Sequence, residues 1–245
     1  MNFQSSDLIL EVGDPLHSVS HTEKESDGFC VISSECASLS YRTIVTGDPE
    51  RADREHRERL AALIGRLFSY YLDKNASSGK RILTVGLGNP SVASDSLGAL
   101  TAEKTISDGE RAFCFVPLTE AQTGLSTAAT VSHAARESKA DTIIAVDSLA
   151  AREPHRLGTV IQITDRGIIP GSGVSQSVGE ISGNTMPCPV IAIGVPTVIR
   201  SDMLYAECGT TFVTPSDIGR LCETFSSHIA AGINSVIFGG GDWRK

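Results

Sequence analysis

Two aspartates, Asp95 and Asp147, are the residues of this 245-residue sequence best suited to chemistry. Each follows an apolar run of the kind that forms a buried strand, residues 81–88 before Asp95 and residues 141–146 before Asp147. Ligands of open α/β sheets bind in the crevice outside the carboxyl ends of the strands, where we expect both acids. Two carboxylates in one crevice can share a proton or hold a metal, and both options lead toward hydrolysis.

Each aspartate also has a purely structural interpretation. Asp147 could cap a segment formed by residues 148–152, and Asp95 could cap the helix that starts at Ser96. The presence of a pair favours chemistry, because repulsion between close carboxylates raises the pKa of one and leaves an acid beside a base. Such a pair can activate water and protonate a leaving amine. An unpaired buried carboxylate is costly, so Asp147 is expected just past its strand or paired.

Other polar residues give weaker signals. Gly86 and Gly88 lack the third glycine of a dinucleotide-binding fingerprint, since Ser91 stands at that position, and we expect them to permit a tight turn and close packing. Asp165 is interpreted as a turn residue. Ser172 lacks the strand–turn–helix context of a serine nucleophile.

Arg152 lies five residues after Asp147 and is expected to return to the crevice, where it would hold one carboxylate ionised. Its alternative is an ordinary surface cation. The six histidines are scattered along the chain, and His133 and His155 are interpreted as surface residues that form no metal-binding pair.

The composition narrows the function classes. A net charge of −8 argues against broad contact with nucleic-acid backbone or with an anionic membrane. Six cysteines occur without a CxxC spacing, which gives no support to a zinc finger. No signal peptide or apolar stretch of transmembrane length is found, so we expect a reduced, cytoplasmic protein with buried thiols.

The elements that must position the aspartates follow from hydrophobic periodicity. The N-terminal third predicts short strands and then a long helix with one apolar stripe: strands at 8–12, 29–32 and 41–45, and the helical stripe at 60–72. Strand–loop–helix units follow, with strands at 81–87, 112–117, 141–147, 158–164 and 189–194 and helices near 95–106 and 126–139. A last helix is predicted with Thr214 as N-cap and Pro215 in its first position.

This alternation predicts an α/β fold, a doubly wound, mostly parallel sheet flanked by helices, with short N-terminal β-strands. We expect one α/β domain over residues 1–245. Residues 1–78 would hold the N-terminal strands and the long helix, and residues 79–245 the doubly wound core.

Several stretches closely resemble the germination protease of spore-forming bacteria. The most specific are residues 147–152, 159–174 and 189–197. Weaker matches are 86–89 with 95–98, 122–124 and 213–215, and residues 6–11 are similar to the family's mature N-terminus. The resemblance runs from about residue 81 to residue 235.

The resemblance implies an aspartic endopeptidase that degrades small acid-soluble spore proteins during germination. Carried over by motif, its catalytic aspartates fall on Asp95 and Asp147. The residues expected to contact substrate are Gln122, Thr123, Arg152, Gly171, Ser172 and Gly173. No cofactor is expected, although a divalent metal at the two aspartates stays open. The expected partners are the spore proteins and further copies of the chain, without direct contact to nucleic acid or membrane, in the spore core or forespore.

Two alternatives remain. The implied fold resembles that of the hydrogenase-maturation endopeptidases, whose equivalent acids bind a metal, so a metal-dependent maturation-type peptidase is one. A relative that binds spore proteins without cutting them is the other, because the interval 198–212 is much shorter than in the family. Pro90 also replaces the family's tryptophan. Only six residues precede Asp7, so self-processing of the usual kind is not expected.

Overall fold

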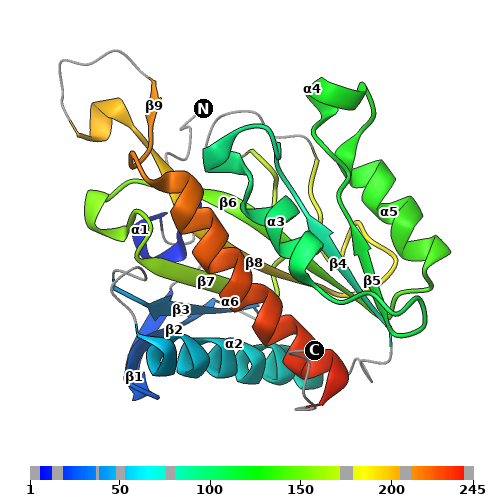
Figure 1. Cartoon of the computed structure of the whole chain (residues 1–245), viewed down its shortest axis with the longest axis horizontal. Helices are drawn as coiled ribbons and strands as arrows, with labels where there is room; N and C mark the ends of the chain where they lie inside the picture. The colour runs from blue at the N-terminus through cyan, green and yellow to red at the C-terminus, as the bar shows by residue number, and fades with distance from the viewer. Residues whose placement is uncertain are drawn as a thin grey trace.

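The computed structural model describes residues 6–12, 19–36, 39–47, 53–75, 81–171, 179–204 and 211–239 (Figure 1). Within these ranges the strands join one sheet, in the order β1–β2–β3–β7–β8–β6–β4–β5, with β9 paired to β8. The strands are β1 (Ser20–Ser26), β2 (Phe29–Cys36), β3 (Leu39–Val45), β4 (Ile82–Gly86), β5 (Ala112–Phe115), β6 (Thr142–Ala151), β7 (Val160–Thr164), β8 (Val190–Arg200) and β9 (Phe212–Val213).

The predicted α/β class is confirmed, but the sheet is mixed. Strands β5, β4, β6 and β8 pair in parallel, whereas β1, β2, β3, β7 and β9 join through antiparallel pairs. The three N-terminal strands therefore extend the same sheet that carries the parallel strands. The helices are α1 (Ile9–Val12), α2 (Arg54–Lys74), α3 (Leu97–Lys104), α4 (Glu120–Thr123), α5 (Thr127–Glu137) and α6 (Ile218–Phe238), with 3-10 turns η1 (Ala93–Asp95), η2 (Pro154–Arg156) and η4 (Ser201–Met203).

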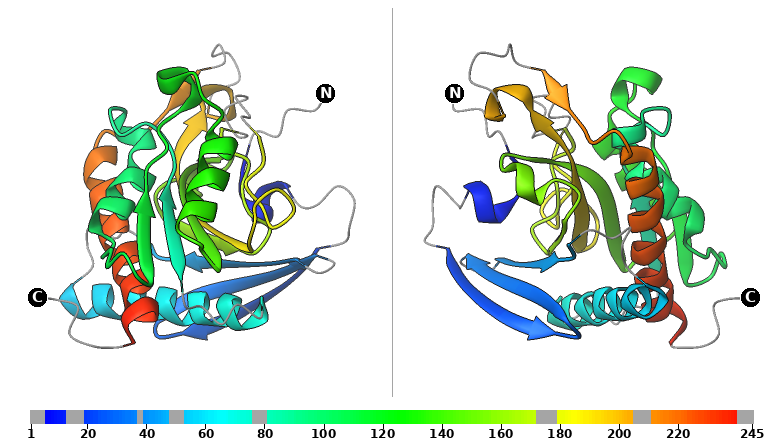
Figure 2. Two further views of the ribbon diagram at one scale, coloured as in Figure 1. Left: turned by 90° about the vertical axis from the view of Figure 1, so that its right-hand side faces the viewer. Right: turned by 60° about the vertical axis from the view of Figure 1, so that its left-hand side comes forward.

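Helices cover both faces of the sheet, as Figure 2 shows. Helices α2, α3 and α6 lie on one face, and their apolar stripes pack on the alternate residues of β6 that include Ile144 and Val146. Helix α5 lies on the other face, where Val131 and Ala135 pack against Ile143. Both faces of β6 are thus buried, which explains its almost continuous apolar run.

Two N-terminal features differ from expectation. Residues 8–12 form the single-turn helix α1 instead of a strand, because the Ser6 hydroxyl accepts the N–H of Leu8 at 3.0 Å and starts a turn. Strand β1 was not predicted, since its mostly exposed residues show no apolar alternation. Asp27 and Gly28, with φ of 55° and 81°, connect it to β2, and this Asp-Gly pair is the hairpin signal that could have revealed it.

The last helix begins later than predicted. Its N-cap is Asp217, while the Thr214 hydroxyl donates to the carbonyl oxygen of Thr197 at 2.7 Å. Its buried apolar stripe includes Ile218, Leu221, Cys222, Phe225, Ile229 and Ile233. None of the helices in the described ranges combines the length and apolar character that a membrane span requires.

Candidate functional site

Asp147 lies inside β6, with only 5% of its surface exposed. It is neither past the strand end nor a helix cap, because β8 continues alongside β6 and pairs Asp147 with Gly194 and Ser148 with Val195. On the other side of β6, strand β4 stops at Gly86, opposite Val146. Asp147 is therefore the first residue of β6 beyond the carboxyl end of β4, where α/β sheets bind ligands.

Asp95 ends the turn η1 and is not a helix cap either, since Ser96 is the N-cap of α3. Its Oδ2 accepts the backbone N–H of Asn89 at 2.7 Å. Gly88 makes this approach possible: its φ is 97°, and a Cβ there would lie 2.7 Å from Asp95 Oδ1. The glycine therefore serves the tight turn and close packing that the sequence predicts.

Helix α3 sits directly on the strand ends because Gly98 has no side chain. A Cβ on Gly98 would lie 2.3 Å from the carbonyl oxygen of Leu87 and 2.5 Å from that of Val146. Since α3 follows Asp95 directly, this contact fixes Asp95 beside the end of the strand that bears Asp147. The two aspartates, remote in sequence, interact electrostatically.

The two carboxyls have unequal environments. Burial raises the pKa of Asp147 well above its ordinary value, and the negative charges of Asp95 and Asp7 raise it further. The N–H of Ser148, 2.9 Å from Asp147 Oδ1, opposes these effects. Burial also raises the pKa of Asp95, but the N–H of Asn89 counteracts it. Asp147 is thus the carboxyl that retains a proton when Asp95 is ionised.

Asp7 is the carboxylate of this region that our strand-end reasoning missed. Its Oδ2 accepts the N–H of Ala150 at 2.8 Å, and its own N–H donates to the carbonyl oxygen of Ala150 at 2.9 Å. The sequence predicts no strand before Asp7, so the rule that located the other two acids does not reach it. The only signal was the resemblance of residues 6–11 to the family's mature N-terminus.

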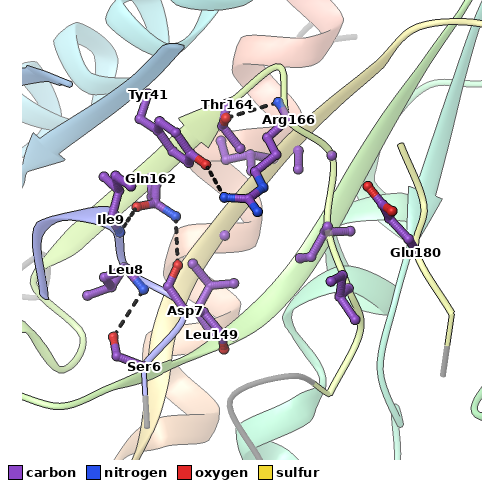
Figure 3. Close-up of a pocket in the computed structure, with 16 residues that line it drawn as sticks. Ser6, Asp7, Leu8, Ile9, Tyr41, Leu149, Gln162, Thr164, Arg166 and Glu180 are labelled. Atoms are coloured by element: carbon purple, nitrogen blue, oxygen red, sulfur yellow. Dashed lines mark hydrogen bonds between the residues drawn. The ribbon is translucent and has the colours of Figure 1, made fainter. Parts of the chain in front are cut away.

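A cavity of about 200 Å³ opens between the N-terminal segment and strands β7 and β8 (Figure 3). The register pairs Gln162–Gly194 and Thr164–Ala192 place two small residues of β8 on this face, and their missing side-chain volume leaves room for the cavity. The N-terminal segment 6–9 forms one wall. As the described residues define it, the cavity reaches Gly194, the register partner of Asp147, but not Asp147 itself.

The predicted contact residues lie in different places. Gln122, on α4, donates from Nε2 to Asn89 Oδ1 at 3.0 Å, and Asn89 in turn donates to Asp95. Thr123 is exposed and its hydroxyl donates to the carbonyl oxygen of Thr119, one turn earlier on α4. Of the pair, Gln122 is therefore the residue linked to the aspartates, through Asn89.

Arg152 does not return to the crevice as expected. Strand β6 remains extended to Ala151, and five residues of strand span about 16 Å. Arg152 is exposed, and its backbone N–H donates to Glu11 Oε2 at 2.6 Å.

The remaining predictions concern turns. Gly171 lies in a turn with φ of 73° and is not among the residues that line the cavity, while Ser172 and Gly173 lie outside the described residues. Asp165 occupies the turn after β7, where it binds Lys74 Nζ at 2.7 Å and accepts the N–H of Ser40 at 2.8 Å.

The described residues do not fit a metal. Within the ranges that the structure describes, no group of three His, Cys, Asp or Glu side chains is arranged to hold an ion. We therefore derive no chemical step through a metal.

Comparison with known proteins gives a consistent picture. The family model described as germination protease matches residues 19–208. The germination protease of Bacillus subtilis (strain 168) is 37% identical over 174 residues, 65% of this chain and 47% of that protein. That of Bacillus pumilus (strain SAFR-032) is 33% identical over 221 residues, 80% of this chain and 60% of that protein. The chain thus spans about half to three fifths of the length of these relatives.

A solved structure is also similar. The [NiFe] hydrogenase maturation protease HycI from Thermococcus kodakarensis KOD1 aligns with 18% sequence identity and a TM-score of 0.45. The alignment covers 69% of this chain and 99% of that one.

Proposed function

The chain belongs to the germination protease family, and from this membership we propose that it hydrolyses peptide bonds with Asp95 and Asp147. The observation that carries the proposal is geometric: Gly98 lets α3, and with it the adjoining Asp95, sit against the carbonyl oxygens of Leu87 and Val146, at the carboxyl end of β4 where β6 bears the buried Asp147. Coupled carboxyls with different environments supply a base and an acid in one site.

The environments suggest which aspartate does what. Asp95, whose carboxylate is stabilised by the N–H of Asn89, takes a proton from water while the water oxygen attacks the carbonyl carbon of the scissile bond. Asp147, buried and proton-bearing, gives its proton to the leaving nitrogen as the C–N bond breaks. The products are a carboxylic acid and an amine, and the proton held by Asp95 restores Asp147 for the next cycle.

The substrate class follows from the family resemblance. We propose small acid-soluble spore proteins as substrates, cleavage in the spore core or forespore, and a homo-oligomeric state. The net charge of −8 argues against broad contact with DNA or membrane. Gln122 is the expected substrate-side residue with the best structural support, because it reaches Asp95 through Asn89.

Two substitutions test the proposal directly. Asp95→Asn and Asp147→Asn should each abolish cleavage of a purified spore protein, measured by mass spectrometry, while circular dichroism shows a folded chain. Asp141→Asn is a matched control, since Asp141 is exposed just before the opposite end of β6. Full activity in either site variant would refute the assignment.

A chelator separates the two peptidase mechanisms. With catalysis by two carboxyls, cleavage continues unchanged after treatment with EDTA and dialysis. Loss of cleavage that a transition metal restores would instead support a metal-dependent maturation-type peptidase. Binding of the spore protein without any cut would support a non-catalytic relative.

A further inference from the structure

We propose that Asp7 is a positioning residue of this active site that acts through Asp147, an inference that rests on the function proposed above. Asp7 belongs to the N-terminal segment 6–12, which is remote in sequence from both aspartates. Three sets of contacts hold the segment in place, and they put its carboxylate beside β6.

The first contact is a two-way bond to β6. Asp7 accepts the N–H of Ala150 through Oδ2 and donates its own N–H to the carbonyl oxygen of the same residue, at 2.8 and 2.9 Å. Ala150 lies three residues beyond Asp147, directly after the register shift between Leu149 and Ala150. Asp7 therefore satisfies backbone groups at the irregular part of β6, three residues along the strand from Asp147.

The second contact is a side-chain amide that clamps the segment from β7. Gln162 Oε1 accepts the N–H of Ile9 at 2.8 Å, and Gln162 Nε2 donates to the carbonyl oxygen of Asp7 at 3.1 Å (Figure 3). Gln162, Gly194 and Asp147 occupy one row across β7, β8 and β6. One row of the sheet therefore fixes both Asp147 and the backbone of Asp7.

The third contact is apolar. Leu8 is 1% exposed and packs with Leu149, Ala151 and Val160. Burial of this leucine side chain stabilises the docked position of the segment.

The consequence for Asp147 is electrostatic. The charged groups that act on Asp147 are Asp95, carried by η1, and Asp7, carried by the N-terminal segment. Both are acids, and each disfavours ionisation of Asp147. Asp7 thereby adds to burial and to Asp95 in favouring the protonated form of Asp147, the form that donates to the leaving nitrogen.

The decisive variant is Asp7→Asn, which removes the charge but retains an oxygen to accept the N–H of Ala150. The basic limb of the kcat/KM profile should move to lower pH by roughly one unit, because Asp147 then loses its proton more readily. Asp7→Glu keeps the negative charge, so the basic limb of its kcat/KM profile should lie at the same pH as in the parent protein. An NMR titration of the carbon-13-labelled Asp147 carboxyl should show the same decrease in its pKa, and this measurement does not depend on turnover.

Glu11→Gln is the matched control. Glu11 is in the same segment and also accepts backbone N–H groups, from Arg152 and Glu153, yet it is not among the groups that act on Asp147. This variant should leave the pH profile unchanged. An Asp7→Asn profile and carboxyl titration that match those of Glu11→Gln would overturn the role of Asp7 alone. A fully active Asp147→Asn variant would overturn the proposed function and this inference with it.

Discussion

Gly88 lies against Asp95 so closely that a Cβ on the glycine would stand 2.3 Å from the aspartate's carbonyl oxygen and 2.7 Å from its Oδ1. Both the backbone and the carboxylate of Asp95 thus depend on a residue seven positions earlier. Because Gly88 also has φ of 97°, no L-residue fits there without strain.

We expect Gly88→Ala to reduce cleavage at least tenfold and to lower the free energy of unfolding by about 2 kcal/mol or more. Urea unfolding and initial rates measure both effects. Gly109→Ala is the matched control, because Gly109 has φ of 70° but a Cβ on it would meet nothing within 4 Å. Its free energy of unfolding should fall by about 1 kcal/mol, because alanine disfavours a positive φ, and its activity should be unchanged.

The buried Asp147 should make stability depend on pH. Its folded-state pKa is raised, so the folded protein holds a proton that the unfolded chain releases near pH 4. The free energy of unfolding therefore falls as the pH rises from about 4 to the raised pKa, and the stability lost is not regained above it.

Asp147→Asn removes this dependence. At pH 7 the variant should be more stable than the parent by on the order of 1 kcal/mol, although it is inactive. Urea midpoints from pH 4 to pH 8 measure the difference. A parent and variant whose midpoints change in parallel would show that Asp147 has no raised pKa.

Gln122 should affect turnover, whereas Thr123 should not. Gln122→Ala removes the hydrogen bond to Asn89, whose N–H donates to Asp95. A hydrogen bond of this kind contributes about 1 kcal/mol to holding the site in place, so we expect a several-fold decrease in kcat. Thr123→Ala removes only a hydroxyl whose partners, Thr119 and Leu125, lie in the backbone that flanks α4. Equal rates for the two variants would mean that the Gln122–Asn89 contact does not serve the site.

Asp165 should contribute to stability and not to catalysis. Its side chain is 6% exposed and binds Lys74, which joins the turn after β7 to α2. Asp165→Ala leaves the ammonium group of Lys74 without this partner, and we expect unfolding to become easier by about 2 to 3 kcal/mol. Cleavage at low temperature should be unchanged. A large loss of kcat in folded protein would make Asp165 a third acid of the site.

The apolar runs predicted the strands of the parallel half well, because burial on both faces makes each run almost continuous. Strand β6 shows the limit of this reasoning. The apolar run is interrupted at Asp147, but pairing with β8 carries the strand on to Ala151. The same pairing carries Arg152 away from the crevice, so a prediction based on separation in sequence failed.

The structure of the N-terminal segment could not be predicted from hydrophobic periodicity, for a different reason. Residues 8–12 fit a short strand and a helical turn equally well, and the choice depends on Ser6 and Gln162. Contacts of this kind join residues more than 140 positions apart, such as Asp7 and Ala150, and no local pattern encodes them.

The bond between Asp7 and Ala150 also bears on how the protein folds. Closing it requires β6 to be formed, and the amide of Gln162 requires β7 to be paired with β8. Contacts of such large sequence separation form slowly and late. The chain must lose the conformational entropy of closing a long loop before the contact contributes any favourable free energy. A chain that emerges from the ribosome with its N-terminus first therefore acquires its complete set of carboxylates only after residues near 194 have joined the sheet. Folding itself would delay the onset of proteolysis during synthesis.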